Sequence, residues 1–247
     1  MDRGAKEIKL TGQDTAAWGV DAGSSLPRLL AAITALPGDF RVRVGMADPL
    51  AVGPIVDELI DAYGSEKVFK FLHLPVQSGD DAILERMKRE YTVEDFERIA
   101  RRFRATFPEL TLSTDVIVGF PGETEREVAA TIELLKRVRP DIVNVTRFSP
   151  RKGTPAAAWK APVGWRVKEW SRRVTAVKAR IGKETNERFV GRAMRVLTTE
   201  PGTSGTTLAR TDNYKQVVLP GELPIGEFLD VRIVGATEID LEGIPAA

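Results

Sequence analysis

Polar side chains follow four of the short β-rich segments in this sequence, at the point where each segment would end. The four clusters contain amides, hydroxyls, carboxylates and arginines, and they are Thr11–Asp14, His73–Ser78, Gly119–Glu123 and Arg147–Pro150. Because the carboxyl ends of parallel strands meet at one edge of a sheet or barrel, we expect the four clusters to surround one site. Some of these residues could instead cap the helices that follow them.

Two amides and one hydroxyl in these clusters suit the binding of a small polar molecule. Gln13, Gln77 and Ser78 are neutral groups that can both donate and accept hydrogen bonds, as the hydroxyls or the carboxylate of a ligand require. For Gln77 and Ser78, the alternative is a loop that leads into a helix with its N-cap at Asp80 or Asp81.

The histidine and the buried-looking carboxylate are the other candidates for chemistry. His73 is the one histidine of the chain, which favours a hydrogen-bonded core residue over a metal ligand or a catalytic base. Asp115 lies in a run typical of a buried strand, and a buried carboxylate needs a partner. Arg147, one strand away, is the candidate partner.

The elements that must position these groups alternate between strands and helices. Strands are predicted at Glu7–Leu10, Arg41–Gly45, Val68–Leu72, Thr111–Val118 and Ile142–Arg147. Helices are predicted at Ser24–Ala35, Val52–Tyr63, Asp80–Met87, Val93–Ala105 and Thr124–Arg137, with N-caps at Ser24 and Thr124. This alternation indicates βαβ units and a parallel sheet, either open or part of a barrel.

The pattern changes in the last third of the chain. Residues 162–188 read as one long helix, because apolar residues recur at a spacing near 3.6. Three tryptophans are expected to pack this helix onto the preceding unit, with base stacking as the alternative: Trp159, Trp165 and Trp170. Short alternating runs then predict a small antiparallel barrel, and they are Arg192–Leu197, Thr206–Arg210, Gln216–Leu219 and Phe228–Val234. We place a domain boundary near residue 186.

Positive charge is concentrated in one segment of a nearly neutral chain. The chain has 36 Lys and Arg residues against 35 Asp and Glu residues, yet residues 166–195 carry ten basic and three acidic side chains. Residues 196–247 carry three basic and eight acidic side chains. The basic segment indicates contact with a polyanion, and a solvated helix face is the alternative.

The composition excludes several classes of protein. The absence of cysteine excludes disulfides, cysteine nucleophiles and thiolate-bound zinc or iron–sulfur clusters within these 247 residues. The apolar stretches are far shorter than the roughly 20 residues of a membrane-spanning helix, and the first residues lack the apolar core of a signal peptide. We therefore expect a cytoplasmic protein.

Several long motifs together resemble the methylthiotransferases of the radical S-adenosylmethionine (SAM) superfamily. They are Asp115–Thr124, His73–Gly79 followed by Met87–Tyr91, and Phe148–Ala156. Leu10–Asp14 is similar to the second strand of that family and its loop. Val44–Pro49 and Thr211–Gln216 are most similar to the archaeal and eukaryotic branch, which acts on N6-threonylcarbamoyladenosine at position 37 of tRNA.

The resemblance implies a fold and a reaction. The fold is an α/β partial (β/α) barrel that lacks its first strand (residues 1–160), a basic connecting helix (161–186) and a TRAM domain (187–247). The TRAM domain is a small OB-like β-barrel with which family members hold tRNA. The reaction inserts sulfur at C2 of the modified adenine and methylates it, with two [4Fe–4S] clusters and two SAM molecules.

The resemblance also implies roles for particular residues. SAM contacts are expected from Gln13, Gln77 and Ser78, and from the backbone of Val118 and Gly119. Arg147 or Arg151 would meet the threonylcarbamoyl carboxylate or a neighbouring phosphate. Contacts with tRNA phosphates are expected from Arg172, Arg173, Lys178, Arg188, Arg192 and Lys215. The negative charge of residues 196–247 would limit these contacts to one face or to the junction.

The sequence departs from the family in its lack of cysteine. The family holds its radical cluster with a Cys-x3-Cys-x2-Cys loop and a second cluster with three further cysteines, and this chain has none. We therefore expect the chain alone to be catalytically inactive. It would be a truncated product, one half of a split gene with a separately encoded cysteine-bearing partner, or the product of a wrongly assigned start.

Two alternative interpretations remain. The chain could be a non-catalytic protein that binds tRNA or another RNA and keeps the fold. It could also be an unrelated cysteine-free α/β enzyme that uses Gln13, Asp115, Glu123 and Arg147 for acid–base chemistry.

Overall fold

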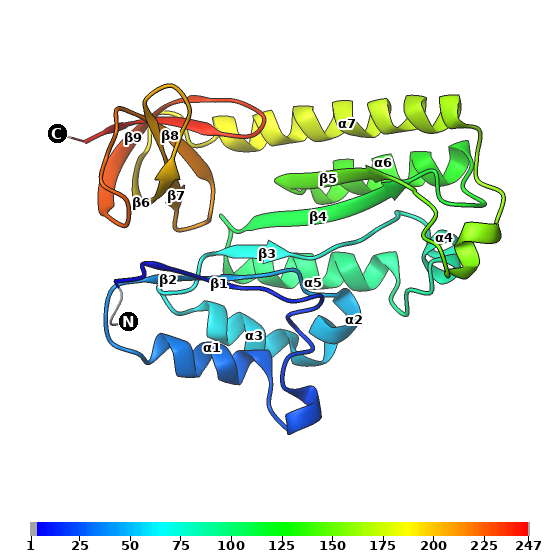
Figure 1. Cartoon of the computed structure of the whole chain (residues 1–247), viewed down its shortest axis with the longest axis horizontal. Coiled ribbons are helices and arrows are strands. Elements are labelled where there is room, and N and C mark those ends of the chain that lie inside the picture. Colours follow the sequence, from blue (N-terminus) through cyan, green and yellow to red (C-terminus); the bar gives the residue numbers. More distant parts are fainter. Residues whose placement is uncertain (1–3, 247) are drawn as a thin grey trace.

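The computed structural model describes residues 4–246, and its first part is built from five parallel strands. The strands are β1 (Glu7–Leu10), β2 (Arg41–Val44), β3 (Phe71–His73), β4 (Thr111–Val118) and β5 (Ile142–Arg147). β1 pairs with β2, and β3, β4 and β5 form a second sheet in that order. Isolated parallel bridges from Val42 to Val68 and from Met46 to His73 join the two sheets. Figure 1 shows β1 and β2 next to β3. The predicted partial barrel is confirmed.

Helices separate the strands and cover the outer face of this partial barrel. They are α1 (Leu26–Thr34), α2 (Pro49–Val52), α3 (Val56–Tyr63), α4 (Asp81–Arg86), α5 (Val93–Thr106), α6 (Glu125–Val138) and α7 (Gly164–Glu187), with short 3₁₀ turns η1 (Val20–Ala22), η2 (Gly53–Ile55) and η3 (Pro155–Ala158). Capping boxes start two of them, at Thr92 with Asp95 for α5 and at Thr124 with Glu127 for α6. The N-cap of α1 is Ser25 and not the predicted Ser24.

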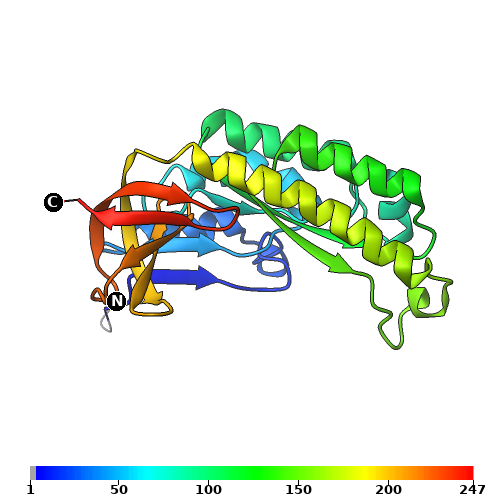
Figure 2. The same ribbon diagram turned by 90° about the horizontal axis from the view of Figure 1, so that it is seen from above.

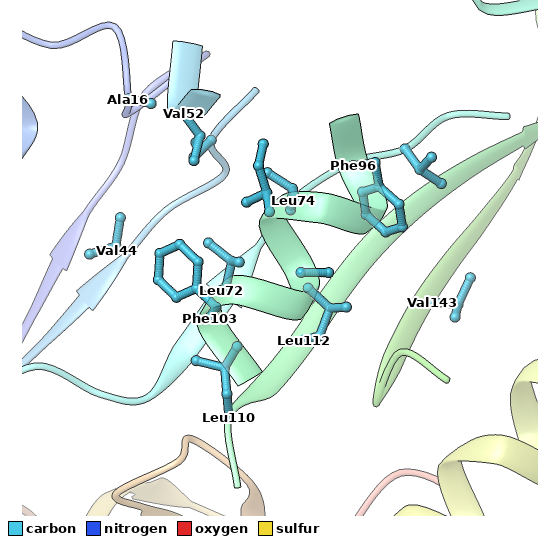
Figure 3. Packing of buried hydrophobic residues seen from close by; sticks show 14 of the residues in the cluster. Ala16, Val44, Val52, Leu72, Leu74, Phe96, Phe103, Leu110, Leu112 and Val143 are labelled. Atoms are coloured by element: carbon cyan, nitrogen blue, oxygen red, sulfur yellow. The ribbon is translucent and has the colours of Figure 1, made fainter. Parts of the chain in front are cut away.

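The main hydrophobic core lies between the strands and these helices. Leu72 and Leu112 project from β3 and β4 toward Phe96 and Phe103 of α5 (Figure 3). Phe103 also meets Tyr63 of α3 edge to face, with the ring centroids 5.2 Å apart. The opposite face of the strands carries polar residues such as His73 and Asp115 together with the buried Phe71. The core thus fixes the strands from the side of the helices.

The second part of the chain is a closed five-stranded barrel. Its strands are β6 (Ala193–Pro201), β7 (Thr206–Thr211), β8 (Gln216–Pro220), β9 (Phe228–Ala236) and β10 (Leu241–Pro245), in the order β10-β8-β7-β6-β9. The predicted small barrel is confirmed, although the sequence analysis missed β10. That strand contains a glycine and a register shift between Glu242 and Gly243, which weaken its alternating pattern.

The closed barrel packs against the amino-terminal ends of the parallel strands. The backbone N–H of Lys70, just before β3, donates to the carbonyl of Asp212 at 2.8 Å. Tyr214 packs on Phe69 and Phe71, with ring centroids 4.8 and 5.0 Å away. Figures 1 and 2 show the closed barrel at one end of α7 and the carboxyl ends of the strands toward the other. The two regions therefore lie at opposite ends of the molecule.

The strand predicted at residues 68–72 is displaced toward the carboxyl end. Val68 makes only an isolated bridge to Val42, and β3 begins at Phe71. Lys70 turns its backbone N–H toward the closed barrel, which interrupts the run. In residues 4–246, no helix is both long and apolar enough to cross a membrane.

Candidate functional site

Two adjoining cavities lie at the carboxyl ends of the parallel strands. The first, which we call the wide cavity, has a volume of about 1050 Å³ and brings together Gln13, Gln77 and Arg151. The second, which we call the aromatic cavity, has a volume of about 450 Å³ and includes Phe120, Arg147 and Arg151. Residues from all four predicted polar clusters therefore surround one region.

Backbone hydrogen bonds hold Gln77 in place, and its side-chain amide remains free to bind a ligand. It has a positive φ of 68°, donates its N–H to the carbonyl of Asp115 at 2.8 Å and accepts from the N–H of Ile117 at 2.9 Å. Its side-chain amide has no hydrogen-bond partner among residues 4–246, and the same holds for Gln13. Both amides line the wide cavity. They fit the neutral hydrogen-bonding role expected of them.

Ser78 does not reach either cavity, contrary to the prediction. Its side chain is fully buried, and its hydroxyl accepts from the backbone N–H of Asp80 at 3.3 Å. Asp80 is the N-cap of α4 and accepts from the N–H of Ile83. Ser78 thus belongs to the cap of that helix, which is the alternative that the sequence analysis left open.

The backbone groups of Val118 and Gly119 that were expected to contact a cofactor are already engaged. The Val118 carbonyl accepts from the N–H of Phe148 at 2.8 Å, and the Gly119 N–H donates to the carboxylate of Glu123. Gly119 has a φ of +84°, and a Cβ there would collide with the side chain of Val167. These contacts fix the turn after β4, and they leave the cofactor contact expected of Val118 and Gly119 as a prediction.

Glu123 holds this turn from a buried position. It is 5% exposed and directly precedes Thr124, the N-cap of α6, so it lies outside the first helical turn. Burial raises its pKa to about 7, against the effect of hydrogen bonds from the backbone N–H groups of Gly119 and Phe120. The carboxyl group therefore changes its charge near neutral pH.

Cations and aromatic rings line the aromatic cavity together. Phe120 meets Phe148 and Trp159 edge to face, with centroids 5.1 and 6.1 Å apart. The Arg86 guanidinium lies 5.2 Å from the Trp159 ring, and its Nε donates to the Pro121 carbonyl. Phe120 lies in the predicted cluster Gly119–Glu123 and base stacking was the alternative given for Trp159, but their meeting in one cavity was not predicted. Their proximity depends on how the loop after β5 folds back over the turn after β4.

Three cations of this region have no partner for their side chains among residues 4–246. They are Lys88, Arg147 and Arg151, and all three line the aromatic cavity. Lys88 and Arg151 line the wide cavity as well. Lys88 was not predicted as a site residue. The one feature of the sequence that pointed to it was its place in the family-like motif Met87–Tyr91.

The concave face of the strands carries a hydrogen-bonded chain around His73. Its Nε2 lies 3.0 Å from Oδ2 of Asp115, and the Asn144 amide donates to Oδ1 of Asp115 at 2.8 Å. Although burial opposes ionisation, these hydrogen bonds lower the pKa of Asp115. The expected pairing of Asp115 with Arg147 is wrong, because Asp115 lies opposite Asn144 in the β4–β5 register, whereas Arg147 lies opposite Val118, three residues further along.

The basic segment divides into paired and unpaired cations. Arg173 pairs with Glu125, and Arg192 pairs with Glu109 at 2.6 Å. Arg188 donates to the Thr185 carbonyl at 3.0 Å. Arg172 and Lys178 of α7 have no ion-pair partner among residues 4–246. Among the residues predicted to contact phosphate, these two are the candidates on the connecting helix.

Lys215 is not a phosphate-binding residue, contrary to the prediction. It is 4% exposed, and its Nζ lies 2.8 Å from Oδ1 of Asp141 and 2.8 Å from Oδ1 of Asn186. Burial lowers its pKa, while the Asp141 carboxylate raises it. The charge is used to join the closed barrel to the first part of the chain.

The three tryptophans have different environments. Trp170 is buried and its indole N–H donates to Glu125 at 2.7 Å, as expected for a residue that packs α7 onto the partial barrel. Trp165 is 63% exposed, and Trp159 lines the aromatic cavity, so neither packs the helix.

The residues of this chain do not fit an iron–sulfur cluster of the family type. The sequence contains no cysteine, and residues 4–246 contain no group of three or more His, Asp or Glu side chains that could hold a metal ion. The wide cavity, by contrast, offers free amides of the kind that bind hydroxyl and carboxylate groups.

Comparisons with known proteins match both parts of the chain. A family model described as the radical SAM superfamily matches residues 2–135, and a model of the TRAM domain matches residues 187–246. Coproporphyrinogen III oxidase from Escherichia coli, described as a radical SAM enzyme, has a similar fold, with a TM-score of 0.57 at 18% identity over 72% of this chain and 41% of that chain.

Curated relatives extend the similarity across both parts. A probable threonylcarbamoyladenosine tRNA methylthiotransferase of Pyrococcus horikoshii is 51% identical over 98% of this chain and 57% of its own length. A relative with the same name in Archaeoglobus fulgidus is 52% identical over 93% of this chain and 54% of its own length. The chain spans little more than half the length of these relatives.

Proposed function

This chain belongs to the radical SAM superfamily, and from that premise we propose that it provides the radical SAM and TRAM portion of a tRNA methylthiotransferase. The proposed substrate is N6-threonylcarbamoyladenosine at position 37, which would become its 2-methylthio derivative. The observation that carries the proposal is identity of 51% across 98% of the chain with a relative named for that activity. The interpretation as an unrelated α/β enzyme is wrong, because the superfamily model matches residues 2–135.

We assign the wide cavity to SAM in this proposal. Gln13 and Gln77 would hold its polar groups through their free side-chain amides. Bound SAM would supply the methyl group of the product. Residues 1–160, 161–186 and 187–247 would serve respectively as the partial barrel, the connecting helix and the RNA-holding domain.

The lack of cysteine places the iron–sulfur chemistry outside these residues. Cluster ligands of the family type would have to come from polypeptide that is not among these 247 residues, such as a separately encoded cysteine-bearing partner. We therefore propose that the chain alone is inactive. The same observation favours a second candidate function, in which the chain binds tRNA without catalysis.

Both candidate functions require contact with RNA, and the unpaired cations of α7 support it. α7 has 24 residues, so it extends about 36 Å from the cavities to the closed barrel. Arg172 and Lys178 lie on this helix without ion-pair partners among residues 4–246. Phosphates that bind them would release counterions, so that affinity would depend steeply on salt.

The test is tRNA binding by the purified chain at about 50 and 200 mM salt, compared with the double variant Arg172→Gln/Lys178→Gln. We expect the double variant to reduce the slope of log K against log salt by about 2, because each lost phosphate contact removes about 0.9 from it. Arg98→Gln/Arg101→Gln on the exposed face of α5 is the matched control and should bind as the parent does. Failure of the parent chain to bind tRNA at low salt would contradict the RNA contact.

A further inference from the structure

The aromatic cavity carries more positive charge than the described residues neutralise. Five cations line it, and no Asp or Glu does. Two of the five are already engaged, since Arg86 donates to the Pro121 carbonyl and Arg89 pairs with Asp48 at 3.1 Å. Lys88, Arg147 and Arg151 have no side-chain partner among residues 4–246. Three like charges around one cavity repel one another, so an anionic ligand would be stabilised there.

Lys88 is held in position by the residues on both sides of it. It follows the C-cap of α4 with a φ of 58°, a conformation that is unfavourable for a lysine. The neighbouring Arg89 pairs with Asp48, and the buried Tyr91 donates its hydroxyl hydrogen to the Pro75 carbonyl at 3.1 Å. These two contacts hold the backbone of the segment Met87–Tyr91 in place. They position the backbone of Lys88 so that this lysine lies at the wall shared by the two cavities.

The rest of the lining indicates a planar ligand. Phe120, Phe148 and Trp159 provide three aromatic rings, and aromatic side chains are favourable neighbours for a nucleobase. The volume of about 450 Å³ is within the range of cavities that bind small molecules. A planar base that carries an anionic group satisfies both the rings and the uncompensated cations.

We propose that Lys88, Arg147 and Arg151 form a specificity site for the carboxylate on the N6 side group of the modified adenosine. The inference rests on the proposed function, and it identifies the carboxylate as the group of the substrate that this site recognises. A carboxylate would accept charge-assisted hydrogen bonds from the two guanidinium groups and the ammonium group. A neutral N6 group, such as isopentenyl, would leave the three cations unpaired and would be rejected. A backbone phosphate offers the same anionic oxygens, but it would not require the aromatic rings.

The experiment titrates the purified chain with nucleosides, so that it does not depend on RNA binding. The probes are N6-threonylcarbamoyladenosine, N6-isopentenyladenosine, adenosine and adenosine monophosphate, with affinities measured by calorimetry or by NMR. We expect the threonylcarbamoyl nucleoside to bind at least tenfold more tightly than the other three. Lys88→Gln, Arg147→Gln and Arg151→Gln should each reduce that preference about tenfold, the effect of losing one charge-assisted hydrogen bond. Lys152→Gln is the matched control, since Lys152 adjoins Arg151 but lines neither cavity.

The outcomes separate this site from the proposed RNA contact. Selective nucleoside binding supports the site even if tRNA does not bind. Equal affinity for all four probes, no detectable binding, or unchanged preference in all three variants would overturn it, even if tRNA binds well. Equal binding of adenosine monophosphate and the threonylcarbamoyl nucleoside would also overturn it, in favour of a phosphate site.

Discussion

Glu123 is a buried carboxyl group whose charge is coupled to the turn beside the aromatic cavity. Its carboxylate accepts the N–H of Gly119, and the next residue, Phe120, lines that cavity. Burial raises its pKa from 4.5 to about 7. The folded chain therefore binds the proton more tightly than the unfolded chain, and Glu123 contributes most to stability when protonated.

We expect the contribution of Glu123 to the free energy of unfolding to be complete below about pH 4.5 and to be lost as the pH rises through 7. Urea unfolding of the parent chain and Glu123→Gln between pH 4.5 and 8 measures it. The stability of the parent relative to the variant should fall by about 2–3 kcal/mol over this range, since each unit of pKa is worth about 1.4 kcal/mol.

Glu127→Gln is the control for the sign of this effect. The hydrogen bond from Thr124, with the other contacts of the capping box, lowers the pKa of Glu127, so its contribution is lost as the pH falls and not as it rises. Parallel stability curves for the parent and Glu123→Gln would show that Glu123 does not titrate in this range.

The loop between β3 and α4 is pressed against α6, which holds the Gln77 backbone in place. The N–H of Gly79 donates to Oγ1 of Thr131 at 2.8 Å. A Cβ at residue 79 would lie 2.7 Å from the backbone nitrogen of Thr131 and 2.8 Å from the carbonyl oxygen of Ala130. These neighbours are helix backbone and cannot move aside easily. The contact of two elements therefore requires glycine at this position.

Gly79→Ala should destabilise the chain by about 1–3 kcal/mol, as overpacking does elsewhere. Thermal or urea unfolding measures the change. Gly53→Ala is the matched control, because no atom lies within 4 Å of its Cβ position and its φ of −47° suits alanine. We expect the control to be neutral or stabilising by up to about 1 kcal/mol. Equal effects in both variants would show that the loop does not press on α6.

The two parts of the molecule are joined by a buried ion pair. Lys215, just before β8, bonds to Asp141, just before β5, and Asp141 also accepts from the N–H of Leu112 at 3.0 Å. Asn213 donates to the Glu109 carbonyl at 2.9 Å beside this pair. The segment Thr211–Gln216 thus fixes the position of the closed barrel relative to the cavities. An RNA that contacts both the barrel and the cavities would have to span the distance between them.

Lys215→Met should lower the free energy of unfolding by about 3 kcal/mol, because it removes one partner of a buried pair. It should also make the region between α7 and β6 more sensitive to limited proteolysis. Arg195→Gln is the control across the same junction, since its pair with Asp39 is half exposed and should be worth less than about 1 kcal/mol. Unchanged stability and proteolysis in Lys215→Met would contradict a fixed junction.

The sequence was a good guide to elements whose signals are local. Capping residues such as Thr124 and alternating apolar runs placed the helices and most strands, because hydrogen bonds between near neighbours define them. β10 was missed and β3 was displaced, since both depend on contacts with distant strands and loops. The motifs indicated the family, which the superfamily and TRAM models bear out.

The candidate site was predicted in location but not in detail. The sequence alone determined that polar groups follow the strands and that no thiolate is present. Only the tertiary structure decided which cations are free, because ion pairs such as Arg192 with Glu109 and Lys215 with Asp141 join residues far apart in the chain. The residue type fixes the charge of a side chain. Whether that charge is neutralised depends on its distance from an opposite charge, and only the folded structure sets that distance.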